Sequence, residues 1–125
     1  MIFTIGYSTK SIEEFINKIK ENGISLVVDV RSHPYSRWNP KFCRHSLEAE
    51  LNKESVGYMF KGDNLGGLDE NKNYWEAINE VIELSLSQSL VVMCTEGDPI
   101  KCHRYLTLTP ELEKLGCKVC HLLWK

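Results

Sequence analysis

The feature of this sequence that most constrains its fold is the regular alternation of short apolar runs with amphipathic helical patterns. The apolar runs predict strands at 2–5, 26–30, 58–60, 90–94 and 118–123, and the helical spacing predicts helices over 11–22, 46–53, 74–87 and from about 99 to 114. Such alternation is typical of a parallel sheet with helices on both faces, joined by right-handed crossovers. We therefore predict a three-layer α/β fold whose mainly parallel five-stranded sheet has the Rossmann-like order 3-2-1-4-5.

Local signals set the expected limits of several elements. The sequence S-I-E-E at 11–14 is a capping box that starts the first helix, and Gly23 is expected to stop it. Pro110 is expected to interrupt the last helix and begin a fresh turn, which Gly116 ends. The stretch GDNLGGLDENKN at 62–73 predicts a loop, in which LGGL permits a tight backbone turn.

Length and composition place the chain in a broad class. With 125 residues it is expected to form a single α/β domain over 1–125. It contains no apolar run of about 18 residues, so no membrane segment is predicted. Its first residues lack the pattern of a secretory signal, which favours a cytoplasmic protein whose five cysteines are thiols rather than disulfides.

A basic loop stands out against a formal net charge of −2. Between residues 31 and 45 lie four Lys or Arg residues and two histidines, with no Asp or Glu. A local basic segment on a mildly acidic protein favours a site for an anion over a general polyanion surface, although a solvated surface loop remains the plain alternative. The loop also carries the aromatic residues Tyr35, Trp38 and Phe42, which could stack on nucleic-acid bases.

Three loops that leave carboxyl ends of predicted strands carry unusual residues. They are GYST at 6–9, the segment DVRSHPYSRWNPKF at 29–42, and CTEGDPIKCHR at 94–104. In the order 3-2-1-4-5 they meet at one crevice, where open α/β sheets bind their ligands. Asp29 lies in a buried strand and needs an arginine partner, for which Arg31, Arg37 and Arg104 are candidates. The predicted ligand-binding residues are Asp29, Arg31, Ser36, Arg37, Arg104, Ser8 and Gly6.

The stretch CTEGDPIKCHR admits several chemistries. A phosphatase-type thiol cradle would need an arginine six positions after Cys94, where the chain has Ile100. Asp98 and Pro99 suit the start of a helix as cap and first residue. Proton transfer is then assigned to Glu96 or His103, which sit beside the basic groups. The catalytic candidates are Glu96, His103, Cys102 and Cys94, with the two cysteines either lining the site or serving as thiols.

Metal binding is considered and not predicted. Cys94, Cys102 and His103, with Asp98 as a fourth ligand, do not have the spacing of a zinc motif. The sequence CKVCH at 117–121 matches a covalent haem motif but falls on a predicted strand. Strand alternation places Cys117 and Cys120 on opposite faces, where both are expected to be buried structural thiols.

The motifs in combination resemble the family called domain of unknown function 488. They are TIGYST at 4–9, DVRSHPYSRWNPKF at 29–42, LGG at 65–67, MCTEGDPIKCHR at 93–104 and VCHL at 119–122. The resemblance spans nearly the whole chain and implies a compact three-layer α/β fold, but it implies no reaction. Tyr7 stands where the family commonly has histidine, and Cys43 where it often has asparagine. The family motif maps onto Asp29, Arg31, Pro34, Ser36, Arg37, Pro40, Cys94, Glu96, Cys102, His103 and Arg104.

The sequence is therefore consistent with three hypotheses for the function. The first is a hydrolase or transferase acting on a small phosphorylated or nucleotide-like substrate, whose anion Arg31, Arg37 and Arg104 would hold. The second is a non-catalytic module that binds an anion or nucleic acid. The third is a protein with a structural metal. The sequence selects no cofactor.

Overall fold

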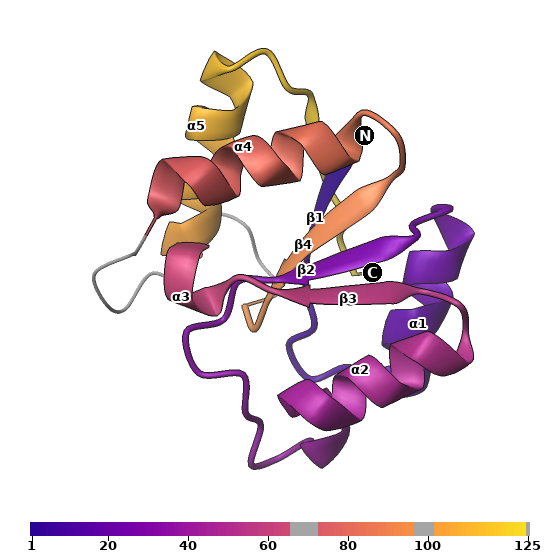
Figure 1. Cartoon of the computed structure of the whole chain (residues 1–125). Helices are drawn as coiled ribbons and strands as arrows, with labels where there is room; N and C mark the ends of the chain where they lie inside the picture. Colours follow the sequence, from indigo (N-terminus) through magenta and orange to yellow (C-terminus); the bar gives the residue numbers. More distant parts are fainter. Residues whose placement is uncertain (66–72, 97–101, 125) are drawn as a thin grey trace.

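The computed structural model contains one parallel sheet with the strand order β3-β2-β4-β1-β5 (Figure 1). It describes residues 1–65, 73–96 and 102–124, and for residues 103–106 it describes the backbone alone. Its strands are β1 (Ile2–Gly6), β2 (Leu26–Asp29), β3 (Gly57–Phe60), β4 (Leu90–Cys94) and β5 (Val119–His121). All the pairings between them are parallel. The predicted three-layer, Rossmann-like α/β fold is confirmed.

The predicted strand order is wrong at the centre of the sheet. β4, not β1, is the middle strand, because Val92 pairs with Val28 of β2 on one side and with Thr4 of β1 on the other. β1 and β4 are both five-residue runs that are buried throughout. Their apolar patterns therefore fit a position between other strands equally well, and neither pattern says which of the two is the middle one.

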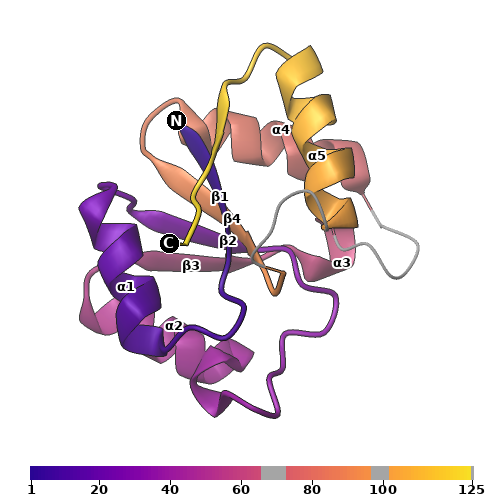
Figure 2. The same cartoon turned by 180° about the vertical axis from the view of Figure 1, so that it is seen from behind.

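The helices divide between the two faces of the sheet. On one face lie α1 (Ile12–Glu21) and α2 (Arg44–Lys53), and on the other α3 (Gly62–Leu65), α4 (Tyr74–Ser85) and α5 (His103–Lys114) (Figures 1 and 2). A short 3₁₀ helix, η1 (Pro40–Phe42), precedes α2. The helices that follow β1 and β2 thus cover the first face, and those that follow β3 and β4 cover the second.

Several local predictions are confirmed. The capping box forms, since Ser11 Oγ accepts a hydrogen bond from the Glu14 backbone N–H and the Glu14 carboxylate accepts one from the Ser11 N–H. α1 ends before Gly23, whose φ of +65° lies in the left-handed region that glycine adopts without strain.

Three local predictions need correction. α3 (Gly62–Leu65) is a helical turn inside the stretch predicted as loop, while residues 66–68 of LGGL lie outside the described residues. α5 continues through Pro110 without a fresh turn. α2 begins at Arg44, two residues before its predicted start, because only Cys43 separates it from the preceding helix η1.

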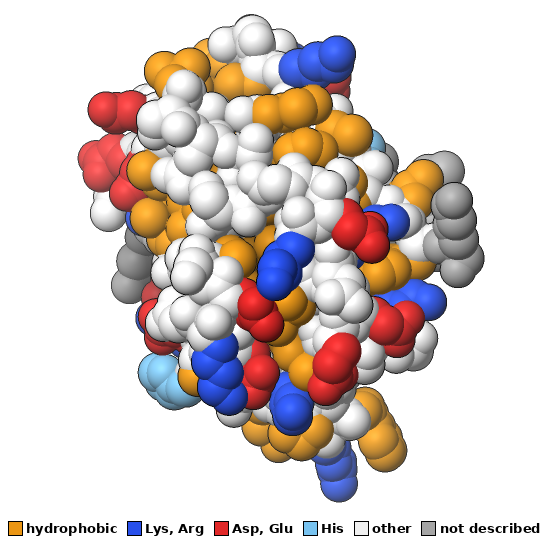
Figure 3. All heavy atoms as spheres, turned by 90° about the vertical axis from the view of Figure 1, so that its right-hand side faces the viewer, with side chains coloured by type: hydrophobic (Ala, Val, Ile, Leu, Met, Phe, Trp, Pro, Cys, Tyr) orange, Lys and Arg blue, Asp and Glu red, His pale blue; other side chains and the backbone are white. Residues whose placement is uncertain are grey.

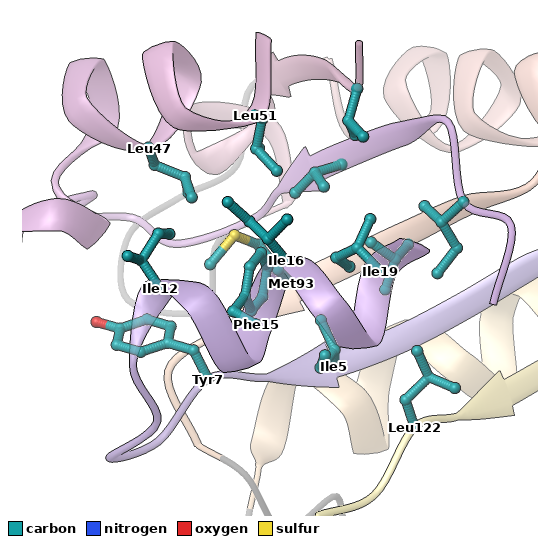
Figure 4. Packing of buried hydrophobic residues seen from close by; sticks show 14 of the residues in the cluster. Ile5, Tyr7, Ile12, Phe15, Ile16, Ile19, Leu47, Leu51, Met93 and Leu122 are labelled. Carbon is teal, nitrogen blue, oxygen red and sulfur yellow. The ribbon is translucent and has the colours of Figure 1, made fainter. Parts of the chain in front are cut away.

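Two apolar clusters fill the space on either side of the sheet. The cluster under α1 and α2 contains Phe15, Leu47, Leu51 and Met93, several of which Figure 4 shows converging beneath α1. The cluster under α4 and α5 contains Ile78, Val92 and Cys94. Cys120, in β5, packs with the first cluster, and Cys117, two residues before β5, packs with the second. The two thiols therefore lie on opposite faces as predicted, although both are half-buried rather than buried. No helix in the described part of the chain is long and apolar enough to cross a membrane.

Candidate functional site

The carboxyl ends of β2, β4 and β1 lie side by side at one edge of the sheet. The backbone N–H of Val30 donates to the carbonyl of Met93 (3.2 Å), that of Tyr7 to Cys94 (3.2 Å), and that of Ser8 to Thr95 (2.8 Å). The segments after β1 and β2 are therefore both attached to the exit of β4. The three unusual loops of the sequence do start from one place, with β4 rather than β1 between the other two.

At this edge Asp29 holds Arg31 in a buried ion pair. Arg31 Nε and Nη2 donate to the two carboxylate oxygens of Asp29 at 2.9 and 2.8 Å, and the Arg31 backbone N–H adds a third bond at 3.0 Å. Asp29 is fully buried and Arg31 is 2 % exposed. Of the three arginines predicted as possible partners of Asp29, Arg31 is the one that the structure pairs with it. Residues i and i+2 of an extended segment project to the same side, which makes this pairing local.

Tyr58 completes the hydrogen bonding of the Asp29 carboxylate. Its hydroxyl donates to Asp29 Oδ2 at 2.6 Å from the neighbouring strand β3. With four donors, Asp29 has no lone pair left for a substrate proton, so it positions Arg31 rather than acting as a base. Sequence reasoning missed Tyr58. The signal for it was the register of β2 against β3, which pairs Val27 with Tyr58 and is not readable from either strand alone.

The surroundings fix the charge states of this cluster. Burial by itself would lower the pKa of Arg31, but the hydrogen bonds and negative charge of Asp29 outweigh it and raise that pKa, with a smaller contribution from the Tyr7 hydroxyl. Burial and then the hydrogen bond to Asp29 raise the pKa of Tyr58. Arg31 therefore stays cationic and Tyr58 stays a neutral donor at physiological pH.

Aromatic rings support Arg31 from its other side. The Arg31 Cζ atom lies 5.5 Å from the centre of the Tyr7 ring, within the range of a cation–π contact. Tyr7 in turn stacks on Phe42 with ring centres 4.0 Å apart. Figure 4 shows Tyr7 at the margin of the apolar cluster, with its hydroxyl pointing away from the packed side chains. Phe42 is fully buried, so the prediction that it offers a stacking surface to bases is wrong.

Two buried polar atoms in this cluster have no hydrogen-bond partner among the residues that the structure describes. They are Arg31 Nη1 and Ser32 Oγ, on consecutive residues just beyond the end of β2. Buried polar groups in native proteins are nearly always paired, and exceptions mark strain, catalysis or a ligand. Asp29 occupies the Nε–Nη2 edge of the guanidinium. The Nη1 atom lies on the opposite edge of the guanidinium and is itself buried.

Gly62 is a second residue that the sequence alone did not single out. A Cβ atom at this position would lie 2.0 Å from the carbonyl oxygen of Arg31 and 2.5 Å from the ring of Phe60. The start of α3 therefore packs its backbone directly on that of Arg31, which only glycine permits.

The other predicted ligand-binding residues are placed less directly. Gly6 ends β1, and its carbonyl accepts a hydrogen bond from Trp124 Nε1 at 2.7 Å. Ser8 is exposed with a φ of +50°, and Ser36 Oγ accepts from the Asn39 backbone N–H at 3.1 Å, which shapes the loop itself. Arg37 is exposed on the same loop. The side chain of Arg104 lies outside the described part of the structure.

The basic loop presents aromatic and cationic side chains to solvent. Trp38 is 93 % exposed and Tyr35 69 % exposed. Lys41 and Arg44 are also exposed, and the Arg44 guanidinium lies 4.3 Å from the centre of the Phe60 ring. The side of the molecule where β2 and β3 begin is different, since acidic and basic side chains are interspersed over it (Figure 3).

The exit of β4 carries the thiol candidates. Cys94 Sγ lies 3.2 Å from Cys102 Sγ, and both residues are buried. Cys94 also donates to the Glu96 carbonyl, while the Glu96 side chain is exposed. Asp98, Pro99 and the side chain of His103 lie outside the described residues. α5 begins at His103 with Cys102 as its N-cap, so the last helix starts later than the predicted position near residue 99. Within the described ranges, no three His, Cys, Asp or Glu side chains form a group that could hold a metal ion.

A separate open groove of about 530 Å³ follows β3, between Lys61 and α4. Its acidic wall includes Glu76, Glu80 and Glu83, and Lys61 pairs with Glu80 at 2.5 Å. Because an acidic groove repels an anion, and the predicted ligand is an anion, this groove is not the predicted site.

Comparison with known proteins gives one match. The profile of a family described as "Domain of unknown function DUF488" matches residues 11–76. That range contains the Asp29, Arg31 and Tyr58 cluster and Gly62, whereas β4 and both buried cysteines lie beyond it. No curated protein and no solved structure matches the chain.

Proposed function

The chain belongs to the DUF488 family, and on that premise we propose that the carboxyl edge of its sheet binds the anionic group of a small phosphorylated or nucleotide-like ligand. The observation that carries the proposal is the pair of buried, unpartnered atoms, Arg31 Nη1 and Ser32 Oγ, beside a guanidinium that Asp29 holds in place.

The hydrogen-bonding capacity of these atoms matches an oxyanion. Leaving a buried donor unpaired costs about 1–3 kcal/mol, so a ligand that pairs Nη1 and the Ser32 hydroxyl recovers that free energy on binding. A guanidinium presents its donors as a planar fork, which suits the oxygens of phosphate or carboxylate. Because Asp29 and Tyr7 restrict the guanidinium in the free protein, little further ordering is needed when the ligand binds.

Charge supports an anion at the same edge. Asp29 already neutralises Arg31, so a phosphate needs further cations. Arg37 and Lys41 supply them from the segment that follows β2, and Arg44 from the first turn of α2; residues 30–47 contain no Asp or Glu. This local potential attracts a small anion even though the whole chain is mildly acidic.

The proposed reaction class is hydrolysis or group transfer on the bound ligand. Glu96 or His103 would handle the proton, since they belong to the exit of β4 and the start of α5. Cys94 and Cys102 pack on the α4 and α5 side of the sheet, whereas Arg31 lies over Tyr7 on the other side, so the two thiols lie apart from the anion-binding residues. Arg104 would add a third arginine to the anion site.

A second candidate function rests on a different observation. The exposed rings of Trp38 and Tyr35 lie in the same segment as the exposed cations Arg37, Lys41 and Arg44, and this segment contains no Asp or Glu. Proteins use this combination to stack and hold single-stranded nucleic acid. In this alternative the loop binds an oligonucleotide without catalysis.

Thermal unfolding in the presence of ligands tests the proposal. The probes are inorganic phosphate, AMP, ATP and a short single-stranded oligonucleotide, each at several salt concentrations. A ligand present at 100 times its Kd should add about 2.7 kcal/mol to the stability, which is readily seen as a higher Tm. Protection by the oligonucleotide alone, with a steep salt dependence, would favour the second function.

Two serine variants, one in the proposed site and one outside it, test whether the ligand binds beside Ser32. Ser32→Ala removes the buried hydroxyl and should weaken phosphate or nucleotide binding about tenfold while leaving the free protein as stable as before, or slightly more so. Ser46→Ala makes the same change at an exposed site on α2 and should bind like the wild type. Arg31→Lys, which loses the fork, should abolish the protection. If no probe protects the wild type, or if Ser32→Ala binds normally, the proposal is wrong.

A further inference from the structure

The exit of β4 and the start of α5 bring two thiols together. Cys94 ends β4, and Cys102 is the N-cap of α5, eight residues later. Their sulfur atoms are 3.2 Å apart, and the side chains are 0 % and 3 % exposed. We propose that Cys94 and Cys102 form a redox-active dithiol that a low-molecular-weight disulfide oxidises to an intramolecular disulfide.

The geometry requires only a small movement for bond formation. A disulfide has a sulfur–sulfur distance of about 2.05 Å, so the two atoms must approach by about 1.2 Å. Cys94 is held by the strand pairing of β4 with β1 on one side. Cys102 has extended backbone dihedrals at the very start of α5 and, unlike Cys94, belongs to no strand of the sheet. The closing movement therefore falls to Cys102.

The two sulfurs have different roles in this chemistry. Cys102 is the more exposed of the pair and sits at the positive end of a twelve-residue helix, where a thiolate is stabilised. It is the attacking thiol. Cys94 is fully buried with its sulfur 3.2 Å from that of Cys102, so it is placed to resolve the mixed disulfide.

The exchange proceeds in two balanced steps. The Cys102 thiolate attacks the small disulfide RSSR, forming a Cys102–S–S–R bond and releasing RS⁻. The Cys94 thiolate then attacks Cys102 Sγ, forming the Cys94–Cys102 bond and releasing a second RS⁻. Two electrons pass from the protein pair to the small disulfide, which is reduced to two thiols, and the two cysteine protons pass to the released thiolates or the solvent.

The other three cysteines are not equivalent to this pair. Cys43 exchanges weak hydrogen bonds with the backbone of Ser36 inside the basic loop. Cys117 and Cys120 pack on opposite sides of the sheet, so their sulfurs face different apolar clusters and do not face each other. Oxidation of the folded protein should therefore select Cys94 and Cys102. This inference is independent of the proposed anion site.

Exposure of the full chain to glutathione buffers of graded redox potential tests the proposal. Thiols are counted after denaturation in acid, and disulfides are located by peptide mapping without reduction. The wild type should lose two of its five thiols and yield one peptide pair joined through Cys94 and Cys102. Return to reducing buffer should restore all five.

Single substitutions separate the two roles. Cys94→Ala lacks the resolving thiol and should accumulate one glutathione on Cys102, whereas Cys102→Ala should show much slower modification at Cys94. Cys120→Ala is the matched control and should form the disulfide like the wild type. Circular dichroism of each variant establishes that it is folded before the thiols are counted.

Three results would overturn the proposal. In the first, folded wild type keeps Cys94 and Cys102 reduced while the half-buried Cys117 and Cys120 are glutathionylated. In the second, the disulfide forms only after denaturation. In the third, the purified protein contains stoichiometric zinc that protects both thiols. Since none of these measurements uses a phosphorylated ligand, failure here leaves the anion site untouched, and failure of the ligand screen leaves the dithiol untouched.

Discussion

Substitution of Asp29 by asparagine tests whether a buried ion pair organises the site. The change preserves shape but removes the negative charge beside Arg31, whose side chain is 2 % exposed. The oxygen of the new side-chain amide can still accept from Nε and the backbone N–H of Arg31. The NH₂ group of that amide, however, would then face Nη2 across a distance that is now 2.8 Å, donor against donor.

The expected loss of stability follows from these contacts. The bond from Arg31 Nη2 disappears, the Tyr58 hydroxyl can no longer donate to this position and must accept from the new NH₂ group, and the cation is left buried without a counter-charge. Breaking a buried pair by removing one partner costs about 3–5 kcal/mol, and we expect the lower end because the side-chain volume is kept. Since domains of this size are stable by about 5–15 kcal/mol, the variant should remain folded but markedly weakened.

Urea unfolding followed by circular dichroism measures this loss. Asp63→Asn, the same change at an exposed position on α3, should stay within about 0.5 kcal/mol of the wild type. The double variant Asp29→Asn/Arg31→Met also removes the unpaired guanidinium, so it should recover part of the lost free energy of unfolding. If Asp29→Asn costs less than about 1 kcal/mol, or if the double variant is the less stable of the two, the buried pair does not hold this edge together.

Three further outcomes are expected. Gly62→Ala should destabilise by about 1–3 kcal/mol, because its Cβ would meet the Arg31 carbonyl at 2.0 Å, whereas Gly57→Ala, which meets only a leucine methyl at 3.2 Å, should cost less; urea unfolding of both compares them. Because the pKa of Tyr58 is raised on folding, its contribution is complete below pH about 10 and is lost as pH rises further; the difference in stability between wild type and Tyr58→Phe should therefore shrink above pH 10, and a constant difference would contradict the shift. Ser11→Ala should lower the stability by about 1 kcal/mol through loss of the capping box, and an unchanged urea midpoint would count against that role.

The sequence predicts the parts of the fold that depend on local patterns. Strand alternation, the capping box at Ser11 and the stop at Gly23 are decided by neighbouring residues, and the structure confirms them. The Asp29–Arg31 pair was also predictable, because residues two apart on an extended segment share a side and a buried carboxylate needs a cation.

The parts that could not be predicted depend on contacts between distant segments. The middle position of β4 is a choice between two equally apolar strands. The bond from Tyr58 to Asp29 depends on the β2–β3 register, and the need for glycine at position 62 depends on where α3 meets Arg31. The burial of Phe42 follows from its stacking on Tyr7, which the spacing of aromatic residues in a loop does not reveal.

The observed strand order changes how the two proposed sites relate. In the order 3-2-1-4-5, β1 would separate Arg31 from Cys94 by an intervening strand. With β4 in the middle, β2 and β4 are neighbours, so the two sites flank a single strand end. Arg31 joins the Tyr7 and Phe42 stack on the α1 and α2 side, whereas Cys94 and Cys102 pack on the α4 and α5 side. The backbone of residues 93–95 lies between them, and its carbonyls accept from Val30, Tyr7 and Ser8. Because β4 stays paired with β1 and β2 while Cys102 makes the closing movement, we expect oxidation to leave these three hydrogen bonds in place and the phosphate affinity unchanged. A phosphate affinity that changes on oxidation would show that the Cys94 backbone moves instead.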